Sequence, residues 1–305
     1  MEGNPKLSAK PTLLLLTGAF VTAFGPALVR LSQLEPTATA FWRLALAFPL
    51  LLWIALRSSG SSKRPSPLLN WPVFAFTAAA FALDLTCWHT SIRLTTVANA
   101  SLFANFAPLI VALVSWRFFG ERFGRGFWLG LGLALFGAGL LVWKGLQVDV
   151  VRLRGDALGF ATAGFYAAYI LGMSRLRGTH GVFLVMAVVS GGSAVFVWVL
   201  TLGLGDNLWP ADPSGWWPLV VLALGPQALG QGCIVYALAF LPPAFGAVNL
   251  LFQPVVAAVI AWLILGEYLG PFELAGIVVV LFGIAIANRA RHTPRSAAPA
   301  ETQAG

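Results

Sequence analysis

The chain has 305 residues, of which 58% are hydrophobic and only 10% are charged, and its mean hydropathy is +0.83. A soluble domain carries about 25% charged residues, so this composition excludes a soluble enzyme or binding module and indicates an integral membrane protein. The formal net charge of +8 is distributed over many loops rather than gathered in one basic patch, and we expect no nucleic-acid partner.

Apolar runs of about 20 residues recur along the chain, which is the length at which an α-helix crosses roughly 30 Å of hydrocarbon. The runs do not alternate polar and apolar residues as the strands of a membrane β-barrel would. The pattern therefore predicts an all-α membrane protein with short connections and ten spans. In chain order, the predicted spans are residues 12–29, 37–56, 71–90, 97–116, 126–143, 157–173, 182–202, 216–240, 244–265 and 271–287.

Lys and Arg residues favour alternate loops. The N-terminus, the loops after even-numbered spans and the C-terminus hold about thirteen of them, the opposite loops hold about five, and Arg43 lies inside a span. Cytoplasmic loops carry the excess of Lys and Arg, so both termini are predicted to lie in the cytoplasm. Residues 1–11 are assigned to a cytoplasmic N-terminus and residues 290–305 to a disordered cytoplasmic tail.

An internal repeat relates the two halves of the chain. Pro108 and Pro254 stand 146 positions apart, and the same offset pairs many other residues without a gap. Between residues 71 and 137 it gives about seventeen identities in about sixty-seven positions, roughly twice what shared apolar composition would give. Each unit has five spans, so the second must enter the membrane inverted, as in secondary transporters. The two units are assigned to residues 12–144 and 155–289.

The motif Gly-Glu occurs once in each unit, as "GERFG" at Gly120 and Glu121 and as "GEYLG" at Gly266 and Glu267. The first copy keeps its arginines and the second lacks them, which places the first in the cytoplasm and the second outside. The glycines suit a left-handed helix end, and each glutamate favours the positive end of the next helix dipole. We assign all four residues to structure, with a gating role as the alternative.

Residues 90–142 and their counterpart, residues 236–288, share a mid-span proline, an apolar helix, Gly-Glu and a Gly-rich helix. Together with "AFWRLALAF" around Arg43, this pattern resembles the two EamA units of the drug/metabolite transporter superfamily, over about residues 12–288. The resemblance implies a ten-helix bundle in which spans one to four and six to nine line a central cavity. It also implies export or exchange of small metabolites, often amino acids, without ATP, in a bacterial inner membrane.

Two ionisable residues lie inside predicted spans at similar depth, Asp84 in span three and Arg43 in span two. A lone charge at the bilayer centre costs about 2.5 to 3.5 kcal/mol, so each should face a cavity or a partner. Asp84 is a candidate to bind a substrate amine or to exchange a proton, and Arg43 to set the pKa of Asp84 or to receive a substrate carboxylate, unless Arg43 simply snorkels outward. A buried structural ion pair is the alternative.

Aromatic and imidazole side chains accompany these charges. Trp88 follows Asp84 by four residues, on the same helical face, and forms either a cation-binding wall or an interfacial aromatic. His89 either contacts substrate and senses pH or is a satisfied interfacial residue. Tyr166 in span six adds a hydroxyl on an aromatic surface, with packing as its alternative role.

Amide side chains form a polar belt near the midplane. Gln227 and Gln231 are four residues apart in span eight, and such a polar face should not point to lipid. We expect Asn105, Gln227 and Gln253 in the cavity, with interhelical hydrogen bonding as the alternative. Pro108 and Pro254 cannot donate a backbone hydrogen bond, so spans four and nine should bend there, as hinges or as fixed kinks.

No P-loop, HExxH or Gly-x-Ser-x-Gly motif occurs in the sequence, and the three histidines are scattered. We therefore expect no enzyme, no metal and no cofactor. The sequence predicts a secondary transporter that exports small metabolites such as amino acids by alternating access, with a small-molecule substrate, the lipid bilayer and possible proton coupling. The alternatives are an intramembrane enzyme, a non-transporting scaffold and, within transport, drug or cation efflux or sugar-phosphate-type exchange. The pattern assigns no oligomeric state.

Overall fold

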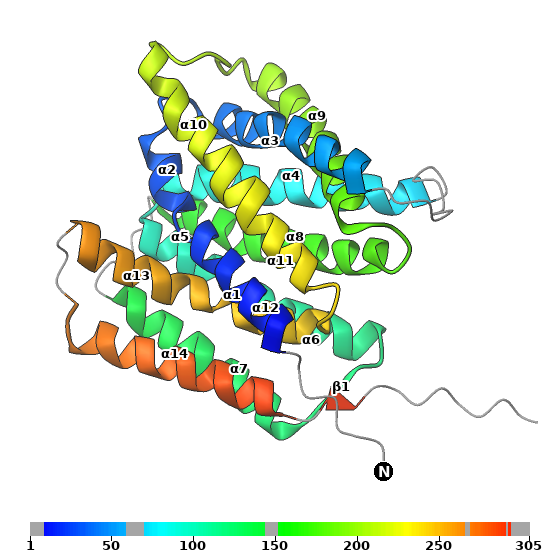
Figure 1. Cartoon of the computed structure of the whole chain (residues 1–305). Helices are drawn as coiled ribbons and strands as arrows, with labels where there is room; N and C mark the ends of the chain where they lie inside the picture. The colour runs from blue at the N-terminus through cyan, green and yellow to red at the C-terminus, as the bar shows by residue number, and fades with distance from the viewer. Residues whose placement is uncertain (1–8, 59–69, 144–151, 266–268, 291, 294–305) are drawn as a thin grey trace, which may run out of the picture.

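The structure, a computed structural model, describes residues 9–58, 70–143, 152–265, 269–290 and 292–293. Its helices run roughly alongside one another in a single bundle (Figure 1). Within these ranges, ten helical segments are long and apolar enough to cross a membrane. The predicted all-α fold with ten spans is therefore confirmed.

The first five spans are α1 (Ala9–Thr22) with α2 (Gly25–Leu31), α3 (Pro36–Ser58), α4 (Trp71–Leu94), α5 (Val97–Ala104) with α6 (Ala107–Phe118), and α7 (Arg125–Val142). The second five are α8 (Leu153–Arg177), α9 (Val182–Leu204), α10 (Trp216–Leu222) with η5 (Ala223–Gly230) and α11 (Gln231–Ala237), α12 (Pro243–Leu250) with α13 (Phe252–Leu265), and α14 (Pro271–Arg289). A short 3-10 turn, η4 (Pro213–Gly215), precedes α10.

Four spans are irregular at or near a proline. Spans four and nine break just before Pro108 and Pro254, where the sequence predicts bends because proline lacks the N–H of the helical ladder. Span one breaks before Pro26, and span eight contains the π-helical segment η5 around Pro226. The breaks divide these spans into shorter helices whose ends meet inside the bundle.

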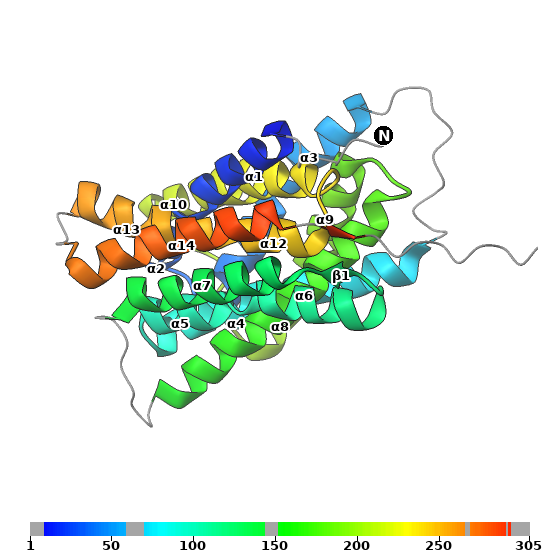
Figure 2. The same cartoon turned by 90° about the horizontal axis from the view of Figure 1, so that it is seen from below.

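The two repeats are related by a two-fold contact between α7 and α14, which lie side by side in both views (Figures 1 and 2). A Cβ on Gly130 would lie 2.6 Å from the Gly283 carbonyl oxygen, and one on Gly137 would lie 2.9 Å from the Gly276 carbonyl oxygen. The offset of 146 converts Gly130 into Gly276 and Gly137 into Gly283, so rotation by 180° maps this contact onto itself. The helices are antiparallel, as the inverted repeat requires.

Other spans follow the same symmetry. Helix α3 packs on its counterpart α9, and α6 packs on α12 of the equivalent span. The pairing of α1 with α11 has its counterpart in the pairing of α8 with α4. The bundle is therefore assembled by contacts between the repeats, and its centre lies where they meet.

The "GERFG" loop pairs with a short strand that follows α14. Strand β1 (Arg122–Phe123) pairs antiparallel with β2 (His292–Thr293). Residues 292–293 of the predicted tail thus pair with this loop, and residue 291 and residues 294–305 lie outside the described residues. The strand pair places this loop and residues 292–293 on one side of the bundle.

Gly120 has a φ of 67°, in the left-handed region that glycine adopts without steric penalty. The next N–H, of Glu121, donates to the Ser115 carbonyl oxygen at 3.1 Å. Contrary to the prediction, Glu121 is not in the first turn of α7, whose N-cap is Gly124, because β1 separates the two. Gly266 and Glu267 lie outside the described residues.

Candidate functional site

A cavity of about 130 Å³ lies at the centre of the bundle, where the repeats meet. Its lining comes from seven spans: one to four, six, eight and nine. Among the described residues, spans five, seven and ten contribute none of the lining side chains. The lining residues of spans one and three lie in the second half of each span, so the cavity extends toward the side opposite β1 and the start of α1.

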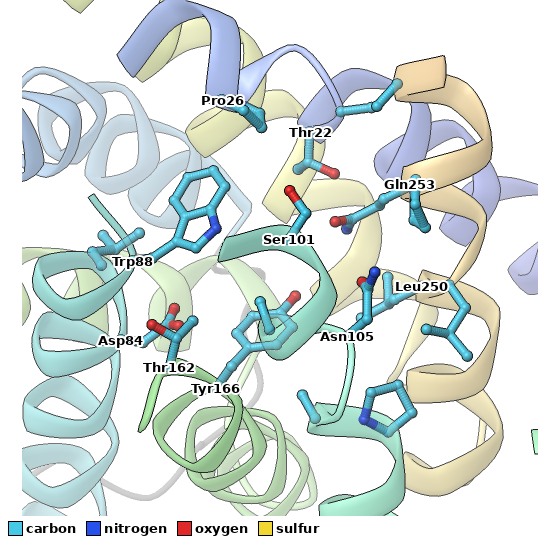
Figure 3. A pocket seen from close by; sticks show the side chains of 18 of the residues that line it. Thr22, Pro26, Asp84, Trp88, Ser101, Asn105, Thr162, Tyr166, Leu250 and Gln253 are labelled. Atoms are coloured by element: carbon cyan, nitrogen blue, oxygen red, sulfur yellow. The ribbon is translucent and has the colours of Figure 1, made fainter. Parts of the chain in front are cut away.

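The breaks in three spans supply much of the cavity wall. Thr22, Ala104 and Leu250 each end a helix, and all three line the cavity. Thr22 and Leu250 are labelled in Figure 3. Pro108 and Pro254 follow two of these breaks and line it too, and the proline at 108 cannot donate to the Ala104 carbonyl. Irregular backbone at membrane depth is tolerated only where it is buried in protein or lines a wet cavity. The backbone thus contributes polar groups alongside the side chains.

Asp84 lies on α4 and faces the cavity. The side chain is buried, with 5% exposed, and within the described ranges its carboxylate accepts no hydrogen bond. A buried carboxylate is costly unless it is paired or hydrogen-bonded. Asp84 is therefore available to a cationic group or to water that enters the cavity.

Arg43 lies on α3, lines the same cavity and is attracted by the Asp84 charge. Its Nε donates to Gln227 Oε1 at 3.0 Å. Over the part of the chain that the structure describes, Arg43 and Asp84 form no direct ion pair. The guanidinium is instead anchored on Gln227, so the structure holds the two charges without the direct pair that the alternative expects.

Gln227 lies behind Arg43 rather than in the cavity wall. It belongs to η5, is 1% exposed, and its Nε2 reaches Ser190 Oγ of α9 at 3.5 Å. Gln231, four residues on, does line the cavity. In an α-helix the two amides would share a face, but the wider i to i+5 bonding of the π-helical segment turns them apart. The preference for Gln227 over Gln231 as a cavity residue is therefore reversed.

Three lining side chains carry buried polar atoms that find no hydrogen-bond partner among the described residues. They are Asn105 Nδ2, Thr162 Oγ1 and Gln231 Oε1. Native structures leave few such atoms, and each calls for a bound water, ion or ligand. A donor, a hydroxyl and an acceptor thus face one space together with two opposite charges, which suits a small polar solute.

Aromatic rings form one wall of the cavity. A Cβ on Gly25 would lie 3.4 Å from the Trp88 ring, so that ring packs against the break in span one. Tyr166 stacks on Tyr169 with ring centroids 5.8 Å apart, and Tyr169 stacks on Phe81 at 4.2 Å. Trp88 and Tyr166 both line the cavity near Asp84 (Figure 3). Aromatic faces beside a carboxylate suit a substrate cation.

Of the other predicted site residues, Gln253 lines the cavity from α13, whereas His89 does not. His89 is fully buried and its Nδ1 lies 3.2 Å from the Pro36 carbonyl oxygen. The structure adds Thr22, Ser101 and Thr162 to the wall. Sequence reasoning missed these hydroxyls because Ser and Thr are common in membrane helices, where they also bond their own backbone.

Ten spans in two inverted repeats around a central polar cavity define a multi-pass membrane protein of the inverted-repeat transporter class. The sequence pattern of the EamA-like transporter family matches residues 9–143 and 153–289. The chain belongs to this family, which is part of the drug/metabolite transporter superfamily.

Several relatives match over most of their length. The uncharacterized transporter YdfC of Bacillus subtilis is 25% identical over 271 residues, which cover 88% of this chain and 87% of YdfC. The pseudopaline exporter CntI of Pseudomonas aeruginosa is 25% identical over 92% of this chain and 96% of its own. The threonine/homoserine exporter RhtA of Escherichia coli is 28% identical over 64% of this chain and 63% of its own. A protein of known crystal structure shares the fold, with a TM-score of 0.78 at 18% identity over 92% of this chain and 98% of its own.

Proposed function

We propose that the protein is a secondary transporter, not an enzyme, that exports small zwitterionic metabolites, amino acids first, by alternating access and without ATP. The observation that carries this proposal is the pair of opposite charges, Asp84 and Arg43, in one central cavity without a direct bond between them. Two relatives named as exporters, one of threonine and homoserine and one of pseudopaline, support export as the direction.

The cavity fits both ends of an amino acid. The substrate ammonium bonds to the Asp84 carboxylate beside the faces of Trp88 and Tyr166. The substrate carboxylate accepts from the Arg43 guanidinium, whose planar fork matches carboxylate geometry. The unpartnered amide atoms of Asn105 and Gln231 supply further polar contacts.

We further propose a bacterial inner membrane, with both termini in the cytoplasm and the cavity on the outer side. Arg122 lies in β1 and Arg125 begins α7, on the side where α1 begins, and the positive-inside rule assigns that side to the cytoplasm. Transport then requires the cavity to close toward the outside and open at the opposite end, with the breaks at Pro108 and Pro254 as flexing points.

Proton coupling is assigned to Asp84, the acidic side chain in the cavity wall. Exchange of a proton at this carboxyl would tie substrate release to the pH gradient. Asp84→Asn removes the titrating group and keeps the shape, so the pH dependence of transport should disappear. An unchanged pH profile in that variant rules Asp84 out as the coupling carboxyl.

The test of the function is a counterflow panel with the purified protein in liposomes, with and without a pH gradient. We expect trace labelled amino acids to accumulate against the same unlabelled amino acid inside, and liposomes without protein to show no exchange. If no amino acid moves in either direction while organic cations do, the site is a cation efflux site. If neither moves, the proposed substrate class is wrong.

A further inference from the structure

The separation of Arg43 from Asp84 needs a physical cause. Opposite charges at membrane depth attract far more strongly than in water, because the surrounding dielectric is low. Both side chains are buried, at 4% and 5% exposed, and both line the same cavity. A direct ion pair would be the default arrangement, and some other contact must hold the guanidinium away.

That contact is the hydrogen bond from Arg43 Nε to Gln227 Oε1 at 3.0 Å. It uses the edge of the guanidinium that carries Nε, and the fork is planar and rigid, so fixing this edge fixes the direction of the remaining N–H groups. The bond also crosses the repeat boundary, because Arg43 belongs to the first repeat and Gln227 to the second.

Gln227 is itself well held. It is 1% exposed, follows Pro226 in η5, and its amide nitrogen reaches Ser190 Oγ at 3.5 Å. Helix α3 packs directly on η5, which keeps the arginine and the amide in register. An acceptor with so little freedom can direct its partner more effectively than an exposed amide would.

We propose that Gln227 is a positioning residue that selects carboxylate-bearing substrates. This proposal rests on the proposed function of the same cavity. By holding Arg43 away from Asp84, Gln227 leaves one positive and one negative group available, and the two ends of a zwitterion take one each. Without this bond the guanidinium turns onto Asp84, and the receptor loses both charges at once.

Two substitutions at this position have different expected results. Gln227→Ala removes the acceptor, so both ends of a zwitterion lose their partners. Gln227→Glu places a carboxylate on Arg43 and neutralises it, which leaves the Asp84 charge alone to attract amine cations. A hydrogen bond to a charged group is worth about 1.5 to 3 kcal/mol, which corresponds to about tenfold or more in affinity.

The experiment compares three labelled probes in proteoliposomes: an amino acid, its decarboxylated amine and its deaminated carboxylic acid. We expect Gln227→Ala to raise KM for all three probes about tenfold or more, because both charges are lost, and Gln227→Glu to shift preference toward the amine by a similar factor. Gln231→Ala is the matched control, because Gln231 lines the cavity and makes no hydrogen bond to Arg43 among the described residues, and it should not favour the amine. Equal losses for all three probes in both Gln227 variants overturn the proposal.

A second comparison isolates the mechanism. In the Asp84→Asn background no carboxylate competes for Arg43, so adding Gln227→Ala should leave KM for the carboxylic acid nearly unchanged. An equally large effect in that background contradicts the proposal.

The structure of the substrate-free Gln227→Ala protein gives a readout that does not depend on transport. A direct Arg43–Asp84 ion pair is expected there, and a guanidinium that keeps its place overturns the proposal. Failure of the wild-type protein to move any probe would instead contradict the proposed function, so the two failures are distinguishable.

Discussion

Helices α5 and α12 occupy equivalent positions in the two repeats, since the offset of 146 maps residues 97–104 onto residues 243–250, yet their surroundings differ. On α5, Ser101 and Ala104 are half-buried and form part of the cavity wall. On α12, every side chain from residue 244 to residue 250 is buried. The same backbone element thus exposes polar and small side chains to the cavity in one repeat, whereas in the other it is closely packed and reaches the cavity only through Leu250 among the described residues.

The sequence explains this difference. Ser101 and Asn105 have Ala247 and Leu251 as their counterparts, so polar atoms are replaced by apolar ones. Phe245 of α12 packs on Phe127 with ring centroids 4.9 Å apart. Polar groups need water or partners, whereas apolar groups are stabilised by burial, so the cavity opens beside α5 and the bundle closes around α12. An inverted repeat therefore supplies a symmetric frame, and the side chains decide which end is open.

The largest effect is expected where α5 borders the cavity. Ser101→Leu adds two heavy atoms to the wall of a cavity of about 130 Å³, which displaces substrate while leaving the packed parts of the bundle untouched. We expect transport to fall by about tenfold or more, equivalent to about 1.4 kcal/mol or more of lost binding. Uptake in proteoliposomes measures the loss, and the melting temperature in detergent should stay within a few degrees of wild type.

The matched substitution on α12 should do the reverse. Ala247 is fully buried on α12, so Ala247→Leu overpacks this helix and should destabilise the fold by about 1 to 3 kcal/mol. Thermal unfolding in detergent measures this cost. If Ser101→Leu and Ala247→Leu lowered stability equally, the contrast between a cavity-lining α5 and a packed α12 would not hold.

The contact between α7 and α14 tests the symmetric part of the molecule. A Cβ on Gly130 would meet the Gly283 carbonyl oxygen at 2.6 Å, and one on Gly276 would meet the Gly137 carbonyl oxygen at 2.8 Å. Gly130→Ala and Gly276→Ala should therefore destabilise the protein by similar amounts, about 1 kcal/mol or more each, because backbone must move. Gly132→Ala on the same helix is the control, since nothing lies within 4 Å of its Cβ, and it should be nearly neutral. Clearly unequal losses of stability in Gly130→Ala and Gly276→Ala would contradict a symmetric contact between α7 and α14.

The repeat made most of the fold predictable from the sequence. The offset that pairs Pro108 with Pro254 depends only on residue identity, and proline chemistry fixes where those spans break. The depth of Asp84 and Arg43 indicated a cavity, because charges at that depth need one. These features follow from local chemistry, which a sequence carries directly.

Features that depend on neighbouring elements were not predictable. The i, i+4 spacing of Gln227 and Gln231 places both amides on one face only if the segment is an α-helix. No residue pattern predicted the π-helical segment that turns them apart. The strand at His292 forms only because the "GERFG" loop lies beside it. Packing between elements far apart in the chain decides both.

A smaller difference between the repeats is a pair of amide hydrogen bonds that joins α12 to α14. Asn249 Nδ2 donates to Asn288 Oδ1 at 2.9 Å and Asn288 Nδ2 donates back at 2.8 Å, whereas the equivalent residues of the first repeat are Phe103 and Val142. Asn288→Ala should cost about 0.6 to 1.7 kcal/mol, the range for hydrogen bonds between membrane helices. Thermal unfolding measures the cost. As a control, Asn105→Ala should cost less, because Asn105 Nδ2 has no partner among the described residues.

The smallest expected effect is a pH dependence at Glu121, in the loop that joins α6 to α7. Its Oε2 is buried without a hydrogen-bond partner in the described ranges, and burial raises the pKa of this carboxyl above its usual value near 4.5. The folded state thus binds the proton more tightly than the unfolded state does. The stability from this protonation is fully present below the unfolded pKa and is lost as pH rises through the folded pKa.

Glu121→Gln keeps the shape and removes the charge, so the variant should be slightly more stable than wild type at neutral pH and should lose less stability between pH 4.5 and neutrality. Melting temperatures at pH 5 and pH 7.5 measure the difference. Glu121 lies on the side of the bundle that α12 closes. If its loop ionises and takes up water when that side opens, the wild-type pH profile should be steeper for transport than for stability. Parallel pH profiles in wild type and variant would mean that the Glu121 carboxylate is solvated in the folded state after all.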